Sequence, residues 1–458
     1  MEIQHTKERK LNLFMLTWPI FIETLLRMLL GNVDTFMLSH YSEKAVAAVG
    51  ATNQIIAMVL VIYSVVSTGT TIVISQYLGA GQKDKANATA VSAMILNFFF
   101  GLFLSLVLII FARPILTMIN LPEELMEYGM QFLRIAGGFS FLQALIATNS
   151  AILRSHGSTR AAMFVVLGMN ILNALGNCIF LYGLFGVPVM GVAGVAISTS
   201  ISQAVAVIAM LVLLIKKMGI KISRKTLLAF DKETIGSILK IGAPSAGEVF
   251  AYQISSLTIT YIITLMGTEA LTTRVMTFNI MWFIMISGLS LGQGTQILVG
   301  HLIGAGDSKQ AYKTCLRSSK IGVVIAVAIA VVLFAFAKPL LGIFTQNPNI
   351  IRTGSILLAI AILLEPGRVL NLVIISSLKA SGDVKFPVLM GMLSPWGIAV
   401  PIAYVLGIHY GMGLIGVWIA FTSDEWLRAI IFSVRWRSRV WENKSLIVRN
   451  LEESSASS

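Results

Sequence analysis

The sequence contains few charged residues. Only 12% of its 458 residues are charged, 56% are hydrophobic, and the mean hydropathy is +0.84. Soluble domains carry about 25% charged residues, so this chain has too little polar sequence to cover a soluble protein. Apolar runs near the length of a membrane span recur along the whole chain, which indicates a polytopic helical membrane protein.

The sequence also lacks the residue patterns of metalloproteins and nucleotide-driven pumps. Its two cysteines, Cys178 and Cys315, lie far apart, and its five histidines are scattered, so no metal-binding spacing occurs. No Walker lysine motif is present. The glycine pattern from Gly411 to Gly416 joins two apolar runs instead of a strand and a helix. We therefore expect no enzyme and no cofactor.

Basic residues are concentrated in one alternating set of loops. Most of the 34 Lys and Arg residues lie in this set and in the two terminal segments. The opposite set contains Lys44, Arg113, Lys338 and Arg352. This asymmetry follows the positive-inside rule and predicts a cell-membrane protein with both termini in the cytoplasm. The net charge of +13 then reports topology, and no nucleic-acid partner is expected.

Twelve apolar runs predict twelve transmembrane helices in an all-α polytopic fold. The first six fall near residues 12–38, 46–77, 89–112, 128–152, 161–182 and 191–215. The second six fall near residues 241–265, 271–302, 320–337, 354–378, 386–407 and 413–433.

The two sets of six runs are related by an internal repeat. Pro19 matches Pro244 and Glu23 matches Glu248, a separation of 225 residues, and this separation still holds between Gly157 and Gly382. Later it shortens to 222 residues. Six helices in each unit make the repeat parallel, about an axis along the membrane normal. The pattern predicts two lobes around a central cavity, as in secondary transporters.

The repeat and the charge pattern together predict four segments. They are an N-terminal six-helix lobe with an ion site at 1–215, a cytoplasmic amphipathic linker at 216–240, a C-terminal six-helix lobe at 241–435, and a cytoplasmic tail at 436–458.

Three ionisable residues lie within the first apolar run. Glu23, Arg27 and Asp34 fall within about 40° of one another around a helix, so one face must point away from lipid. Glu23 and Arg27 can pair one turn apart, whereas Asp34 is about two turns beyond Arg27. Asp34 therefore needs another partner, a ligand or a proton, unless it reaches the outer interface.

The repeat singles out four polar positions of the first half. Asp34, Asn173, Asn177 and Thr199 correspond in the second half to Ile259, Ile398, Ile402 and Phe421. A carboxylate, two amides and a hydroxyl form an oxygen-rich set that suits a small hard cation such as Na⁺, or a proton. The alternative is that the two asparagines only join helices by hydrogen bonds.

The second half carries different intramembrane charges. Glu365 with Arg368, and Asp424 with Arg428, have the spacing of helix-neighbour pairs. Glu248 has no cation within one turn of its own helix, which makes it a candidate for the cationic group of a substrate. Tyr252 is among the aromatic residues that could line an apolar cavity.

Several longer motifs together resemble those of the multidrug and toxic compound extrusion (MATE) transporters. They are GNVDTFMLSH, the QYLGAG and HLIGAG helix ends, ILRSHGSTR, SLKASGDVKFP, and GVAGVAISTS matched by GMGLIGVWIA. The resemblance covers about residues 12–435. It implies alternating access in which inward flow of H⁺ or Na⁺ drives export of small organic cations and amphipathic drugs, by a protein we expect to be a monomer.

The resemblance also implies roles for individual residues. The family's first-helix acid falls on Asp34, and its cation-site partners fall on Asn173, Asn177 and Thr199. Another branch uses acids of the seventh and tenth helices, at positions that are Tyr252 and Arg368 here.

That second mechanism is therefore not carried over. Glu248 and Glu365 lie one turn away from those positions and are, with Tyr252 and Arg368, the candidate substrate-binding residues. The rival functions are a lipid-linked precursor flippase of the same superfamily and, more remotely, a membrane-embedded enzyme.

Overall fold

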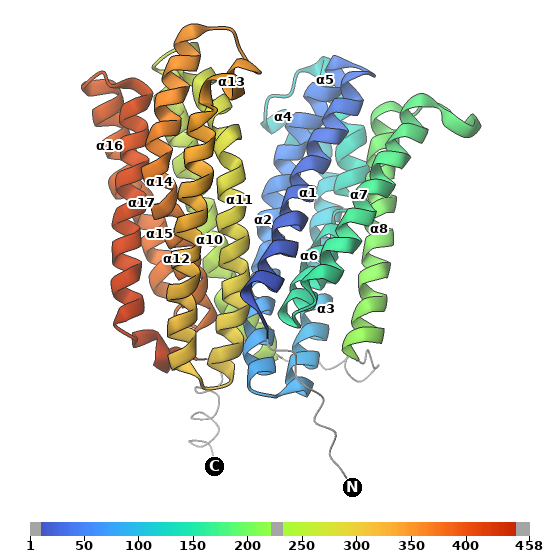
Figure 1. The fold of residues 1–458 in the computed structure, drawn as a ribbon. Helices are drawn as coiled ribbons and strands as arrows, with labels where there is room; N and C mark the ends of the chain where they lie inside the picture. The colour runs from blue at the N-terminus through green and yellow to red at the C-terminus, as the bar shows by residue number, and fades with distance from the viewer. Residues whose placement is uncertain (1–10, 221–231, 446–458) are drawn as a thin grey trace.

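A computed structural model describes residues 11–220 and 232–445, which are almost entirely helical. Figure 1 shows two helix bundles side by side, one formed by each half of the chain. The first contains α1 (Leu13–Ser39), α2 (Glu43–Gly79), α3 (Lys83–Ile110), α4 (Ala112–Met118), α5 (Glu123–Phe132), η1 (Leu133–Gly137), α6 (Phe141–Ser155), α7 (Thr159–Tyr182), η2 (Leu184–Gly186) and α8 (Gly191–Met218).

The second bundle repeats this order. It contains α10 (Lys232–Thr264), α11 (Thr268–Gly304), α12 (Ser308–Ala335), α13 (Ala337–Gly342), α14 (Pro348–Ala380), α15 (Lys385–Ser394), η3 (Pro395–Ala399), α16 (Val400–Tyr404), η4 (Val405–His409), α17 (Gly413–Arg437) and η5 (Val440–Lys444). The first helix of the first bundle begins, and the last long helix of the second bundle ends, at the same end of the molecule (Figure 1). We call this the basic end.

The predicted helical membrane fold is confirmed. In the described residues, nine helical segments are long and apolar enough to cross a membrane, or ten when the bent segment from α5 to α6 counts as one span. The two remaining long helices, α10 and α17, bring the number to the twelve expected. Both contain intramembrane charges, Glu248 in α10 and Asp424, Glu425 and Arg428 in α17, which lower their hydropathy.

Several helices extend beyond the apolar runs that predicted them. α12 begins at Ser308, where the side chain of Asp307 caps it by accepting a hydrogen bond from the Gln310 amide at 2.9 Å. α3 begins at Lys83. Polar first turns of this kind can extend beyond the hydrocarbon region, so hydropathy alone places the start of such a helix too late.

The structure describes parts of the predicted linker and tail. Residues 232–240 of the linker belong to α10, where Ile238 and Ile241 bury their side chains in a cluster with Val66 and Val73. Residues 221–231 of the linker lie outside the described residues.

The start of the predicted tail is packed against the second bundle. Trp436 and Trp441 are fully buried, and their rings stack with centroids 4.1 Å apart. Lys444 and Arg435 both bind Asp383, at 2.7 and 2.8 Å. Residues 446–458 lie outside the described part of the chain.

The two bundles meet through repeat-related contacts near the basic end. The Gln76 side chain of α2 donates to the Ala380 carbonyl at 2.7 Å, and the His301 ring of α11 bonds the Ser155 carbonyl at 2.7 Å. Gln76 and His301 are repeat partners, as are Ala380 and Ser155. The same pseudo-twofold axis therefore relates the two lobes and the bonds that join them.

Glycines allow α2 and α11 to approach closely at this contact. A Cβ on Gly79 would lie 2.0 Å from the His301 carbonyl oxygen, and one on its repeat partner Gly304 would lie 2.0 Å from that of Gln76. Small residues at helix crossings let membrane helices pack backbone to backbone. The LGAG and IGAG sequences thus act as an interface between lobes as well as helix ends.

Replacing Gly79 by alanine is expected to destabilise the contact between the lobes by about 1–3 kcal/mol, the usual cost of overpacking. The matched control is Gly50→Ala on the same helix, where an added Cβ meets no atom within 4 Å. Removing a helix glycine there should stabilise by about 0.5–1 kcal/mol. Thermal unfolding in detergent measures both variants. Equal melting temperatures for the two variants would contradict the proposed backbone contact.

Candidate functional site

The four polar residues selected by the repeat lie together in the first bundle. Asp34 comes from α1, Asn173 and Asn177 from α7, and Thr199 from α8. Asn173 and Asn177 are fully buried, and Asp34 and Thr199 are partly buried. We call these four residues the N-lobe polar cluster.

A directed chain of hydrogen bonds connects the cluster. The Thr199 hydroxyl donates to the Val195 carbonyl at 2.9 Å, and the Asn173 Nδ2 donates to Thr199 Oγ1 at 3.0 Å. The Asn177 Nδ2 donates to Asn173 Oδ1 at 3.3 Å and to Asp34 Oδ1 at 2.6 Å. The Asn177 amide therefore donates in two directions, to the Asp34 carboxylate and to Asn173, and from Asn173 the donors continue away from the carboxylate to Thr199.

One oxygen of the cluster has no partner. Among the described residues, no group hydrogen-bonds the buried Oδ1 of Asn177. A buried acceptor left unpaired costs about 1–3 kcal/mol, so such an atom often marks the place of a missing water, ion or proton donor. Together with Asp34 and the Thr199 hydroxyl it supplies the hard oxygen ligands that Na⁺ prefers.

In the part of the chain that the structure describes, no group of three or more His, Cys, Asp or Glu side chains is arranged to hold a metal ion. The donor set of the N-lobe polar cluster has a single carboxylate and otherwise neutral oxygens. Such a set matches a monovalent cation or a proton better than a divalent metal.

Hydrogen bonds between α1 and α7 hold the cluster in register. The Asn170 side chain donates to the Leu26 carbonyl at 2.7 Å, and the Thr159 hydroxyl donates to the Met15 carbonyl at 3.1 Å. These bonds and the Asn177–Asp34 bond follow one face of α7. Asn170 and Thr159 were not selected from the sequence, although the spacing of Asn170 and Asn173 puts both on one face of the helix.

Glu23 of α1 and Glu248 of α10 form ion pairs that are related by the repeat. Glu248 accepts from Lys379 at 2.7 Å, and its repeat partner Glu23 lies 3.8 Å from Arg154. Arg154 and Lys379 are themselves repeat partners. Glu248 has no cation within one turn of its own helix, but Lys379 of α14 supplies one.

Glu23 and Arg154 also connect the two bundles. Arg27 binds Glu23 at 3.0 Å, as the helix spacing predicts, and Arg154 donates to the Gln293 side chain of α11 at 3.1 Å. At the repeat partner of Gln293 the chain has Thr68. This link between lobes is therefore asymmetric, unlike the bonds of Gln76 and His301.

Five charged residues of α14 and α17 form one buried network. Arg368 binds Glu365 at 2.5 Å and Glu425 at 3.2 Å. Arg428 binds Asp424 at 2.7 Å and Glu425 at 3.1 Å. The two helix-neighbour pairs predicted from spacing are both present, and Glu425 joins them across α14 and α17. Three carboxylates and two guanidinium groups leave a formal charge of −1.

Neutral polar groups complete this network. Asn371 donates to the Glu425 carboxylate at 2.7 Å, and the Ser394 hydroxyl donates to Asp424. Neither residue was selected from the sequence. Tyr252 on α10 lies near Arg368 and Glu425. Three of the four candidate substrate-binding residues, Tyr252, Glu365 and Arg368, therefore lie at this network. The fourth, Glu248, lies in the separate pair with Lys379.

The chain matches the MatE family profile twice, at residues 19–179 and 244–405. The two matches correspond to the two halves of the internal repeat. The first match runs from Pro19 in α1 to Ile179 in α7, and the second runs from Pro244 in α10 to Val405, where η4 begins.

Curated relatives share the whole length of the chain. The chain is 50% identical to the transporter YisQ of Bacillus subtilis (strain 168) over 439 residues, which are 96% of each protein. It is 27% identical to the probable multidrug resistance protein NorM of Thermotoga maritima, covering 97% of this chain and 96% of that protein.

Solved structures share the fold at lower sequence identity. An outward-facing structure of a multidrug resistance MATE family transporter of the MOP superfamily superposes with a TM-score of 0.85 at 20% identity, over 93% of this chain and 95% of that one. A MATE crystal structure in the bent conformation gives a TM-score of 0.86 at 20% identity, over 97% and 96%.

Replacing Arg368 by methionine is expected to lower the free energy of unfolding by about 3–5 kcal/mol, because Glu365 and Glu425 would lose a buried cationic partner. Adding Glu365→Gln should recover part of this loss. Denaturant titration in detergent measures both. The control is Arg352→Gln, an exposed position on the same helix, which should be nearly neutral. A methionine variant as stable as this control would show that Arg368 is not needed to neutralise Glu365 and Glu425.

Proposed function

Because the chain belongs to the MATE family of membrane transporters, we propose that it exports small organic cations and amphipathic drugs from the cell, driven by inward flow of H⁺ or Na⁺. Relatives are named as probable multidrug resistance proteins, which supports this substrate class. The protein is a transporter and not an enzyme. Both termini would lie in the cytoplasm, where the positive-inside rule puts the basic end, and no organic cofactor would be required.

The observation that carries the proposal is the N-lobe polar cluster. It joins α1 to α7 through the Asp34 carboxylate and α7 to α8 through Thr199, and the Asn177 amide oxygen has no partner among the described residues. The second lobe has apolar residues at the corresponding positions. The fold that the two lobes share therefore does not need this set of polar groups. A site whose polar groups serve only one lobe suits binding of a coupling ion better than it suits scaffold packing.

Helix α1 connects the cluster to the contact between the lobes. Asp34 lies near one end of α1, and near the other end Leu16 and Ile20 pack against Ile297 of the second bundle. Between them, Glu23 pairs with Arg154, which reaches Gln293. A change in how α1 packs on α7 can therefore alter the contact between the lobes, as alternating access requires.

The two coupling ions would use Asn177 differently. A proton on Asp34 removes the charge that strengthens the hydrogen bond from Asn177, which loosens α1 from α7. A sodium ion at Asp34 would take oxygen ligands from Asn177, Asn173 and Thr199. With H⁺ as the coupling ion, the amide nitrogen of Asn177 is the important atom, whereas with Na⁺ it is the amide oxygen.

The substrate would bind between the lobes on the second bundle. The network around Arg368 has a formal charge of −1, and Tyr252 lies at the same network. The ring centroids of Phe278 and Trp282 on α11 are 6.4 Å apart, and the two rings offer aromatic faces for a planar cation. In this proposal Glu248, Tyr252, Glu365 and Arg368 contact or position the substrate, and the working unit is a monomer.

The Asp34→Asn variant is expected to fold and to lose ion-driven export, because amide substitution keeps the shape but removes the titratable group. Dye efflux from proteoliposomes under a pH gradient or a Na⁺ gradient alone measures the loss, which should be at least about tenfold. Asp84→Asn, an exposed acid on α3, is the control. Normal ion-dependent export by the Asp34 variant would disprove the assignment.

The Asn177→Leu variant is expected to separate the two coupling ions. If Na⁺ is the coupling ion, loss of an amide ligand should raise the Na⁺ concentration for half-maximal export by about tenfold or more, the energy of one hydrogen-bonding group. If H⁺ is the coupling ion, export under a pH gradient should persist with a shifted pH dependence. Unchanged dependence on both gradients would remove Asn177 from the site.

A further inference from the structure

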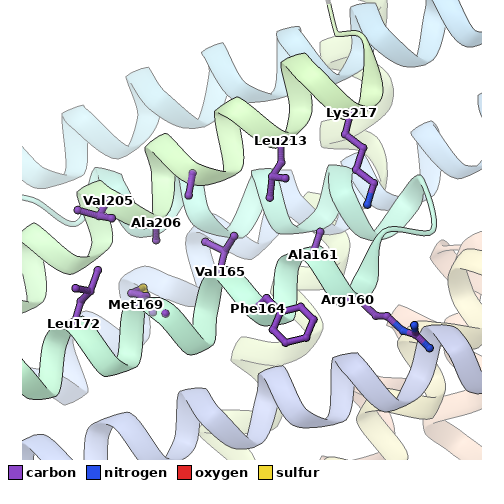
Figure 2. Close-up of a pocket in the computed structure, with 12 residues that line it drawn as sticks. Arg160, Ala161, Phe164, Val165, Met169, Leu172, Val205, Ala206, Leu213 and Lys217 are labelled. Carbon is purple, nitrogen blue, oxygen red and sulfur yellow. The ribbon is translucent and has the colours of Figure 1, made fainter.

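A groove between α7 and α8 lies outside the transport mechanism proposed above. It has a volume of about 590 Å³ and is lined by small and apolar side chains, with Arg160 and Lys217 at one end. Figure 2 shows this arrangement, with the two basic residues at the same end of the groove and Leu172 and Val205 at the other. Figure 1 places α7 and α8 on the side of the first bundle away from the second, where a membrane protein faces lipid.

We propose that this groove binds an anionic phospholipid, with an acyl chain along its floor and the phosphate at Arg160 and Lys217.

The groove exists because α7 and α8 separate toward the basic end. The helices are close at Gly176, where an added Cβ would lie 2.2 Å from Ser198 Oγ, and Ser198 donates to the Asn173 carbonyl at 2.8 Å. Two turns away, an added Cβ on Gly168 would meet no atom within 4 Å. Ala161 and Ala209 continue this hollow with side chains too short to fill it.

The length of the groove fits one membrane leaflet. Arg160 and Leu172 are twelve positions apart on α7, which corresponds to about 18 Å at 1.5 Å per residue. One leaflet contributes about half of the roughly 30 Å hydrocarbon core. An acyl chain whose headgroup lies at Arg160 therefore reaches the end of the groove near the middle of the bilayer.

The charges at the mouth fit a phosphate. Arg160 and Lys217 are both exposed, and within the described ranges neither forms a salt bridge with an acid. The guanidinium of Arg160 lies 5.4 Å from the centroid of the Trp18 ring on α1, a contact that leaves its N–H groups able to donate. Basic residues at this depth attract anionic lipids, whereas a zwitterionic headgroup gains little.

The second half of the chain provides an internal comparison. The repeat partners of Arg160 and Lys217 are Lys385 and Arg439, so both lobes have a basic pair. However, the partners of Ala161, Gly168 and Ala209 are Phe386, Leu393 and Ile431, which would fill the corresponding hollow. Arg439 is also engaged, by Glu442 at 3.5 Å and by the Tyr312 ring at 4.7 Å.

A second surface groove is apolar but has no basic residues at its mouth to bind a phosphate. It lies between α14 and α17, has a volume of about 650 Å³, and is lined by apolar residues, two hydroxyls and Trp426. No basic residue lines it. An acyl chain could lie there, but nothing in its lining would select an anionic headgroup.

Native mass spectrometry of the purified full-length chain, titrated with phosphatidylglycerol and phosphatidylcholine, tests the proposal. The wild type should retain phosphatidylglycerol in preference to phosphatidylcholine. Arg160→Gln with Lys217→Gln should weaken phosphatidylglycerol binding by about 25-fold, at about fivefold for each cation. The matched control, Lys385→Gln with Arg439→Gln, should leave this binding unchanged.

A filled groove provides the second variant. Gly168→Leu introduces the residue that stands at the repeat partner, Leu393. It should remove the tightly retained lipid and leave the melting temperature unchanged, because an added Cβ meets no atom within 4 Å. Equal binding of the two lipids by the wild type would overturn the proposal, as would equal effects of the two basic double variants. Retention of phosphatidylglycerol by the Gly168 variant would place the lipid elsewhere. None of these outcomes depends on transport.

Discussion

Every charge buried within the spans has to be neutralised or hydrogen-bonded, and this requirement organises the whole molecule. Glu23, Glu248 and the acids of α14 and α17 are each matched by a cation from a neighbouring helix or from the next turn of their own helix. A charge left alone in hydrocarbon would cost several kcal/mol. The ion pairs therefore determine which faces of these helices meet, and the hydrophobic clusters fill the space around them.

Asp34 departs from this pattern. Its hydrogen-bond partner is the neutral amide of Asn177, and in the described part of the chain it forms no salt bridge. Every other carboxylate with a comparable position in the spans is matched by arginine or lysine. The difference gives a physical reason to connect Asp34 with an exchangeable cation, since a fixed counter-charge would remove the need for one.

Duplication has produced two lobes with the same scaffold and different polar interiors. The lobe contact retains its symmetry, because Gly79 and Gly304 allow the same backbone approach and Gln76 and His301 make equivalent bonds. The interiors have diverged, with a chain of neutral hydrogen bonds in one lobe and a network of ion pairs in the other. The lipid-facing surfaces have diverged too, since Gly168 opens a groove where Leu393 stands in the second lobe.

Much of this organisation could be derived from the sequence. Hydropathy predicted the helices because a membrane span needs a long apolar run, and the repeat predicted two lobes because its register is constant over most of each half. Comparison of the repeats also selected all four residues of the N-lobe polar cluster, since the side chains that differ between the halves are those not required by the shared scaffold. Pairs within one helix, such as Glu365 with Arg368, followed from helical spacing.

Only the tertiary structure decided the partners that come from different helices. Lys379 reaches Glu248, Glu425 bridges two arginines, and Arg154 reaches Gln293, over separations in the chain that no local pattern constrains. The groove between α7 and α8 likewise depends on the angle at which two helices diverge. The sequence by itself determined which residues are costly to bury; the packing of the helices determined which groups compensate each of them.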